Sequence, residues 1–297
     1  MTGPGPWVLF TATCREWWKD NTFRLAAALA FYTIFSLAPV LVVAVEIASL
    51  AFSQEEVREQ IVSQIQSLVG GRVGGAVSEI LAGISQIRGN PLAVAIGIAT
   101  TFIGSTAVFA ELQSGLNQIW DVKTDPNRSA LKRLLFSRLR SFGIVLAVGF
   151  FLLVSLALSA VLLAAEHYLS GRIPAAPWLW SLANYGSLFL FTALLFALIY
   201  RYLPDVKISW KDVSMGAGVT ALLFLGGKFL IGLYLGQFAV GSTYGAAGSF
   251  AVLLIWVYYS ALICLFGAEF TQVYARRYGN RIRPAPHAVR AGQKPEK

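Results

Sequence analysis

The sequence predicts an all-α, polytopic membrane protein with six transmembrane helices. Six apolar runs each reach the roughly 20 residues that a helix needs to cross ~30 Å of hydrocarbon. Hydrophobic residues make up 56% of the 297 residues, whereas charged residues make up only 13%. The expected spans lie at about 25–50, 92–118, 142–165, 180–200, 213–235 and 244–273. We therefore expect one membrane bundle over 25–278 instead of two soluble domains.

Residues 1–24 precede the first span and are rich in aromatic and basic side chains. The aromatic residues are Trp7, Phe10, Trp17 and Trp18. Indole rings and basic side chains are both favoured where membrane meets water, so we expect either a short interfacial helix on the cytoplasmic side or a frayed aromatic anchor. The run that follows is long and lacks a clear cleavage site, which predicts an uncleaved span.

The first span contains Pro39, which lacks a backbone donor and clashes with the carbonyl group of Phe35. We expect a kink there, with Ser36 or Thr33 helping to satisfy the freed backbone groups. Kinks often mark moving helices or helices that line a cavity. A static kink is an equally good interpretation.

The connection at 53–90 predicts an amphipathic helical hairpin on the extracytoplasmic side. Apolar residues recur at helical spacing on both sides of a glycine-rich turn, at Val57, Ile61, Ile65 and Leu68 and again at Val77, Ile80, Leu81, Ile84 and Ile87. The hairpin either covers the outer mouth of a cavity or rests on the span ends and lipid headgroups.

The fifth span carries several glycines, which favour close approach between helices. They are Gly216, Gly218, Gly226, Gly227, Gly232 and Gly236. After the sixth span, the basic tail at 279–297 contains Pro284 and Pro286 and is expected to be disordered.

The distribution of Lys and Arg predicts the orientation. Nineteen of these residues fall on the side that holds both termini, and four fall on the other. Cytoplasmic loops carry the excess of Lys and Arg, so both termini should be cytoplasmic. The net charge of +9 then indicates membrane lipids, and in particular anionic inner-leaflet headgroups, as partners instead of nucleic acid.

Four ionisable side chains lie within the expected spans, at Glu46, Glu111, Lys228 and Glu269. A charge in hydrocarbon costs ~2.5 to 3.5 kcal/mol, so such groups usually face the bundle interior, water or one another. Glu111 and Asn117 belong to the most polar stretch of any span. That stretch forms either an inward-facing hydrophilic cavity or a hydrogen-bond network that joins helices.

Two of these charges have candidate ion-pair partners. Glu46 and Lys228 are expected at similar depths, ~9 and ~12 Å below the outer surface, so they can form an ion pair, although Lys228 can also extend outward alone. Glu269 lies seven residues before Arg276, which makes a structural ion pair an alternative to a substrate-binding role.

Two stretches resemble signatures of the YihY/virulence factor BrkB family. The first runs Ala26-Ala27-Ala28-Leu29-Ala30-Phe31-Tyr32-Thr33-Ile34-Phe35-Ser36-Leu37-Ala38-Pro39, and the second runs from Tyr244-Gly245 through Leu254-Ile255-Trp256-Val257-Tyr258-Tyr259-Ser260 to Gly267-Ala268-Glu269-Phe270. Asn117, Ile119 and Trp120 match as well. The resemblance implies a six-span bacterial inner-membrane protein and supplies no agreed catalytic residues.

Because members of that family were once catalogued as ribonuclease BN, an enzymatic role has to be tested against the residues. A metal-dependent nuclease needs several His, Asp or Glu side chains around a cation. The two histidines, His167 and His287, are expected on opposite sides of the membrane, and no nucleophile stands beside a positioned base. We therefore expect no enzyme, no metal and no cofactor.

These features favour a transporter or translocase of a lipid or other amphiphilic envelope precursor. The candidate substrate-binding residues are Glu46, Glu111, Asn117, Lys228 and Glu269. The alternative is a membrane scaffold or envelope-assembly factor with an envelope protein partner, whose internal charges only hold helices together. A ribonuclease is a distant third. The sequence leaves the oligomeric state, substrate and coupling ion open.

Overall fold

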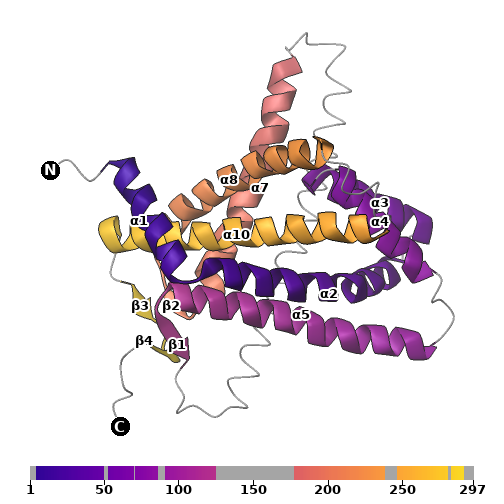
Figure 1. The fold of residues 1–297 in the computed structure, drawn as a ribbon, viewed down its shortest axis with the longest axis horizontal. Helices are drawn as coiled ribbons and strands as arrows, with labels where there is room; N and C mark the ends of the chain where they lie inside the picture. The colour runs from indigo at the N-terminus through magenta and orange to yellow at the C-terminus, as the bar shows by residue number, and fades with distance from the viewer. Residues whose placement is uncertain are drawn as a thin grey trace. The chain divides into compact units, whose positions relative to one another are not determined.

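The computed structural model describes residues 5–49, 53–69, 71–85, 91–124, 177–237, 246–279 and 282–290. Within these residues the chain is mostly helical, and it also forms short strands that the sequence did not predict (Figure 1). The helices are α1 (Pro6–Lys19), α2 (Thr22–Ala48), α3 (Gln54–Val69), α4 (Gly71–Ser85), α5 (Pro91–Ile119), α7 (Pro177–Tyr202), α8 (Trp210–Gln237) and α10 (Ala246–Tyr278). The strands are β1 (Val122–Thr124), β2 (Val206–Lys207), β3 (Arg283–Pro284) and β4 (Ala288–Arg290).

The chain divides into two compact units. Unit 1 comprises Met1–Asp20, Leu116–Leu225 and Phe266–Lys297, and unit 2 comprises Asn21–Gly115 and Gly226–Leu265. Helices α5, α8 and α10 contribute residues to both units.

Among the described residues, three helical stretches are long and apolar enough to cross a membrane. They are Tyr185–Tyr202, Trp210–Ile231 and Phe250–Tyr278, in the places expected for spans four to six. The pair Trp7–Lys19 and Thr22–Ala38 also qualifies if it is one broken span with a bend of 66°, which raises the number to four. The expected third span at 142–165 lies outside the described residues. The six-span count therefore stays a prediction.

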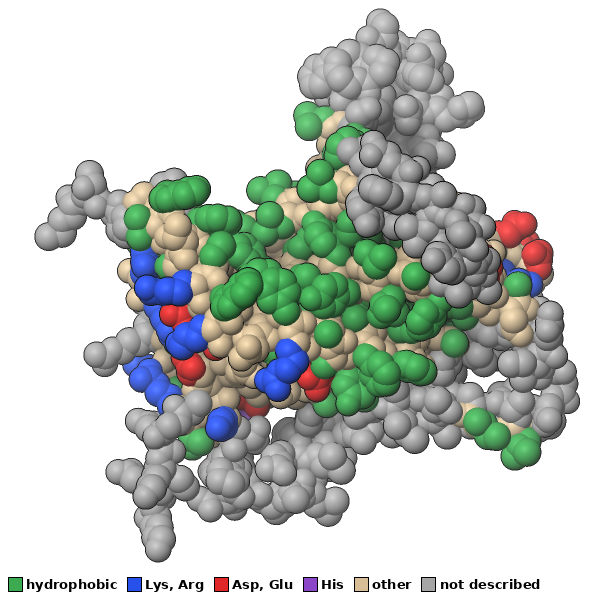
Figure 2. Space-filling model, in the orientation of Figure 1, with side chains coloured by type: hydrophobic (Ala, Val, Ile, Leu, Met, Phe, Trp, Pro, Cys, Tyr) green, Lys and Arg blue, Asp and Glu red, His purple; other side chains and the backbone are tan. Residues whose placement is uncertain are grey.

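Apolar side chains cover much of the visible flanks of α8 and α10 (Figure 2). The exposed hydrophobic residues of α8 include Leu222, Phe229 and Leu230, and those of α10 include Phe250 and Leu254. Large apolar side chains turned outward along a long helix suit a hydrocarbon environment and are unusual on a monomeric soluble protein.

Helix α1 forms within the aromatic N-terminal segment. Pro6 stands at its start, where the missing backbone donor has no intrahelical partner to lose. Trp7 and Trp18 are 73% and 72% exposed. Trp17 instead packs edge-on against Phe266 of α10, with ring centroids 5.7 Å apart. The predicted interfacial position of α1 stays a prediction.

Helices α3 and α4 form the predicted helical hairpin and contact each other. Ser53 begins α3 with a capping box. Its backbone N–H and its hydroxyl group donate to Glu56 Oε2 at 2.9 and 2.6 Å, and its hydroxyl oxygen accepts from the Glu56 N–H at 3.4 Å. The apolar stripe is buried at Val57, Val77 and Leu81. The predicted extracytoplasmic location of the hairpin stays a prediction.

Two glycines of α8 allow close packing against α10, one in each unit. In unit 1 a Cβ atom at Gly216 would collide with the Thr271 side chain, and in unit 2 one at Gly227 would collide with the phenol of Tyr259. At Gly218 and Gly226 no atom of the described residues lies within 4 Å of that position. The predicted role in helix packing is therefore confirmed for Gly216 and Gly227, and for the other two it stays a prediction.

Pro39 lies within α2, which is one helix from Thr22 to Ala48. The Ser36 hydroxyl group donates to the Thr33 carbonyl group at 2.9 Å, three residues back. Ser36 is thus engaged one turn before the proline. The kink itself stays a prediction.

Both strand pairs lie in unit 1 and involve the C-terminal tail. β1 pairs antiparallel with β4, with Val122 opposite Arg290, and β2 pairs antiparallel with β3, with Val206 opposite Pro284. The prediction of a disordered tail is therefore wrong for residues 282–290. Strand pairing uses backbone groups, so the proline and the basic side chains that suggested disorder did not prevent it.

Candidate functional site

Glu269 is the most deeply buried ionisable residue of α10. Its side chain has no exposed surface, and neither carboxyl oxygen accepts or donates a hydrogen bond to the described residues. It lies within the apolar stretch Phe250–Tyr278. An ionised carboxylate in such a place is costly unless a cation or several donors compensate it.

Asp20 faces Glu269 from the end of α1. Its backbone N–H donates to the Glu16 carbonyl group at 2.9 Å, and its own carbonyl group accepts from Gln118 Nε2 at 2.7 Å. Asn21 follows with a φ of 52°, a left-handed conformation that Asn tolerates and that ends α1. These constraints fix the Asp20 backbone at the end of α1 and next to Gln118 of α5.

The carboxyl groups of Asp20 and Glu269 lie close enough to interact electrostatically, although Glu269 makes no hydrogen bond of ordinary geometry. Burial raises the pKa of Asp20, the interaction with Glu269 opposes this shift, and the charge of Asp121 adds to it. We refer to Glu16, Asp20 and Glu269 as the carboxyl cluster.

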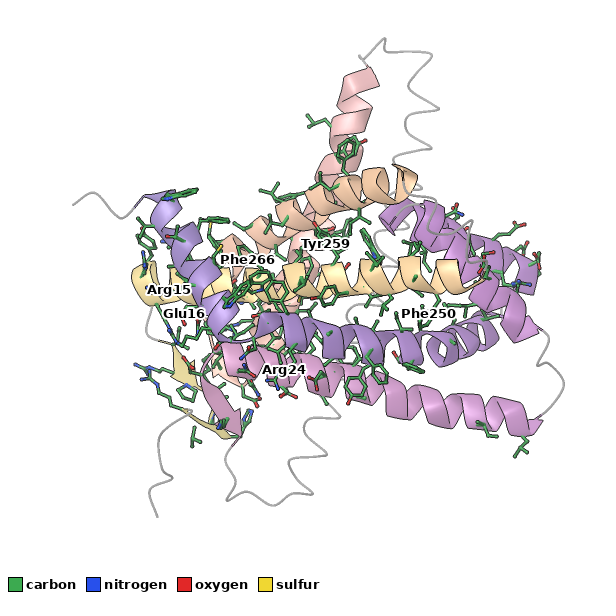
Figure 3. The ribbon with its side chains drawn as sticks, in the orientation of Figure 1. Arg15, Glu16, Arg24, Phe250, Tyr259 and Phe266 are labelled. Carbon is green, nitrogen blue, oxygen red and sulfur yellow. The ribbon has the colours of Figure 1, made fainter. Side chains whose placement is uncertain are left out.

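The basic side chains next to Glu269 form ion pairs with carboxylates other than Glu269. Lys19 Nζ lies 2.9 Å from Glu16 Oε2. Arg276 forms an ion pair with Asp121, so the structural pairing of Arg276 with Glu269 that the sequence suggested is not what the structure shows. Figure 3 shows Arg15 and Glu16 on α1 beside Phe266 on α10, all within unit 1.

Asn117 belongs to a second polar network in unit 1. Its Nδ2 donates to Asp205 Oδ2 at 3.0 Å, and its Oδ1 accepts from the Asp205 N–H at 2.8 Å. His287 Nε2 lies 2.9 Å from Asp205 Oδ1, and the Ala285 N–H donates to the Asp205 carbonyl group at 2.9 Å. We call Asn117, Asp205 and His287 the Asp205 clamp. It joins the end of α5, the turn after α7 and the tail.

The other predicted site residues belong to unit 2. Glu111 on α5 and Lys228 on α8 are both half-buried. The backbone of Glu46 lies in α2, but its side chain is outside the described part of the chain. The ion pair between Glu46 and Lys228 therefore stays a prediction.

Among the described residues, no group of three or more His, Cys, Asp or Glu side chains could hold a metal ion.

Sequence reasoning missed Asp20, Asp205 and His287. Asp20 stands between two helices, where an acidic residue looks like an ordinary surface turn. Asp205 and His287 are 82 positions apart, and nothing in a single sequence connects them. Asn117, a polar residue at the end of an apolar span, was the sequence signal that could have pointed to the Asp205 clamp.

Comparison with known proteins places most of the chain in one family. The family model described as "Virulence factor BrkB" matches residues 13–292. A UPF0761 membrane protein of Alcanivorax borkumensis is 26% identical over 267 residues, which cover 89% of this chain and 60% of that protein. A UPF0761 membrane protein of Pseudoalteromonas translucida is 26% identical over 271 residues, covering 90% of this chain and 85% of that protein.

A similar UPF0761 membrane protein of Pseudomonas paraeruginosa is 28% identical over 251 residues, covering 84% of this chain. The chain spans 58% of the length of this relative and 60% of the Alcanivorax protein. No solved structure matches the chain. The match to the family model and the several apolar helices lead to one conclusion: this chain is a multi-pass integral membrane protein that belongs to the virulence factor BrkB family.

Proposed function

We propose that this protein is a non-enzymatic translocase that moves a lipid or another amphiphilic envelope precursor within the bacterial inner membrane. The observation that carries the proposal is Glu269, a buried carboxyl group without a hydrogen bond to the described residues in an apolar helix. Ionisable residues that remain inside membrane segments despite their cost usually serve a transport pathway.

The proposed orientation places both termini in the cytoplasm. Its support is the excess of Lys and Arg on the side of the termini, 19 against 4. In unit 1 the visible basic side chains gather around α1 and the end of α10 (Figure 2), where anionic headgroups of the inner leaflet would attract them.

A scaffold or envelope-assembly factor is the second candidate. The Asp205 clamp supports it, because here the polar residue Asn117 of an expected span serves to join chain segments. If Glu269 also has a purely structural role, replacing it should affect accumulation but not lipid movement.

Reconstituted vesicles distinguish the two functions. Purified full-length protein is placed in vesicles with a fluorescent phospholipid, and quenching from outside reports the exchange between leaflets, with and without a pH gradient. We expect wild type and Glu59→Gln, an exposed position on α3, to accelerate exchange and Glu269→Gln to lose the acceleration. If wild type moves no lipid under either condition, the translocase proposal is wrong.

A further inference from the structure

Two members of the carboxyl cluster, Asp20 and Glu269, interact with each other, while the basic side chains Lys19 and Arg276 pair with Glu16 and Asp121. Glu269 is fully buried, and its two oxygens lack hydrogen bonds to the described residues. Asp20, at the junction of α1 and α2, is the acidic residue that interacts most strongly with it. Two carboxylates that interact at short range in a partly desolvated place do not both ionise readily, because each raises the cost of charging the other.

The charged groups around Glu269 come from three parts of unit 1. Glu16 and Lys19 lie on α1 and pair with each other at 2.9 Å. Asp121 follows α5 and pairs with Arg276 on α10. Arg276 thus belongs to a separate ion pair, and Asp20 and Glu16 are the acidic groups that act on Glu269.

The charged side chains around Glu269 are more exposed than Glu269 itself. Glu269 has no exposed surface, Asp20 is half-buried, and the Glu16 and Lys19 side chains are 20% and 69% exposed. Asp20 is thus the less buried of the two interacting carboxyl groups. The same arrangement lacks the convergent oxygen ligands that a metal ion needs, among the residues described.

We propose that Glu269 and Asp20 form a proton-binding site in which the two carboxyl groups hold one proton and exchange it with solvent through Asp20. On binding, an O–H bond forms at Glu269 and a hydronium ion becomes water. On release, the Glu269 O–H bond breaks, the proton passes to the Asp20 carboxylate and then to water, and the charge of the pair changes by one unit. The use of this proton to drive transport rests on the function proposed above, whereas proton binding does not.

Infrared difference spectroscopy tests the site in the full-length protein in lipid bilayers. We expect a carbonyl stretch from a protonated carboxyl group at neutral pH that shifts in D₂O and disappears reversibly in alkali. Glu269→Gln should remove this band, Asp20→Asn should change its frequency, and Glu59→Gln should leave it unchanged. A band that survives in Glu269→Gln, or no band that exchanges with D₂O in wild type, overturns the site.

Asp20→Asn keeps the test decisive if Glu269→Gln fails to accumulate, because Asp20 is only half-buried. A band that does not respond to this variant contradicts the shared site. The alkaline titration of the band is run once in a choline buffer and once in a sodium buffer, which distinguishes a bound proton from a bound sodium ion. Loss of the band when sodium replaces choline at fixed pH also contradicts the proposal. If the protein moves lipid in vesicles but shows no such infrared band, only the proton-binding site is disproved. If it shows the band but moves no lipid, only the translocase function is disproved.

Discussion

Asn117 and Asp205 exchange two hydrogen bonds, of 3.0 and 2.8 Å, across 88 residues of the chain. The Asp205 side chain is almost entirely buried, and its second oxygen lies 2.9 Å from His287. One aspartate thus holds the end of α5 and the C-terminal tail at the same point of unit 1.

The Asp205 clamp predicts an order of stabilities. Asp205→Ala leaves both Asn117 and His287 without this partner and should lower the free energy of unfolding the most. Asn117→Ala should cost about 1–3 kcal/mol because it leaves buried groups of Asp205 unsatisfied. His287→Ala should cost less, since its side chain is 31% exposed and water can replace it. Thermal unfolding in detergent measures the stability of the three variants. Equal losses of stability in Asp205→Ala and His287→Ala would contradict this account.

The glycines of α8 give a matched comparison. Gly216→Ala drives a methyl group into the hydroxyl oxygen of Thr271 and also too close to its β-carbon, which cannot move without the backbone, so we expect about 1–3 kcal/mol of destabilisation. Gly227→Ala meets the end of the Tyr259 side chain, which can rotate, and should cost less. Gly218→Ala and Gly226→Ala meet no atom of the described residues and should be neutral or stabilising by up to about 1 kcal/mol. The same unfolding measurement checks this order, and a loss at Gly218 equal to that at Gly216 would disprove it.

The capping box of α3 predicts a local pH dependence. Hydrogen bonds from Ser53 to the Glu56 carboxylate hold the pKa of Glu56 below its usual value. A depressed pKa in the folded state stabilises α3 above the ordinary glutamate range, and this stabilisation is lost as the pH falls through the lowered value. Hydrogen exchange in α3 should therefore accelerate in acid beyond its intrinsic pH dependence. Ser53→Ala should remove that extra pH dependence, and a variant that retains it would show another cause.

The orientation predicts a labelling pattern. In a background with Cys14→Ser and Cys264→Ala, a cysteine at the exposed position Ser63 of α3 should react with an impermeant thiol reagent outside intact spheroplasts. A cysteine at the exposed position Lys207 of β2 should react only after lysis. Reaction in the opposite pattern would reverse the positive-inside assignment.

Sequence reasoning predicted the helices better than the contacts among them. Apolar runs identified α7, α8 and α10 because hydrocarbon length fixes how long such a run must be. Composition also suggested close packing by glycine, but it could not select Gly216 over Gly218, because the choice depends on which helix face meets α10.

The polar contacts of unit 1 escaped prediction for a related reason. Glu269 was recognised as a costly residue, yet Arg276 on its own helix was suggested as its partner. The structure pairs Arg276 with Asp121 and sets Asp20 beside Glu269. Chain neighbours are visible in a sequence, whereas the partners chosen by helix packing are not.

The pairing of the tail has a consequence for the order of biosynthesis. Strands β1 and β2 leave the ribosome long before their partners β4 and β3. Until then both edges have unpaired backbone groups, and Asp205 lacks His287. Unit 1 therefore reaches its final form only after α10 has been synthesised, and a nascent chain stalled before residue 282 would present two open strand edges to chaperones and proteases.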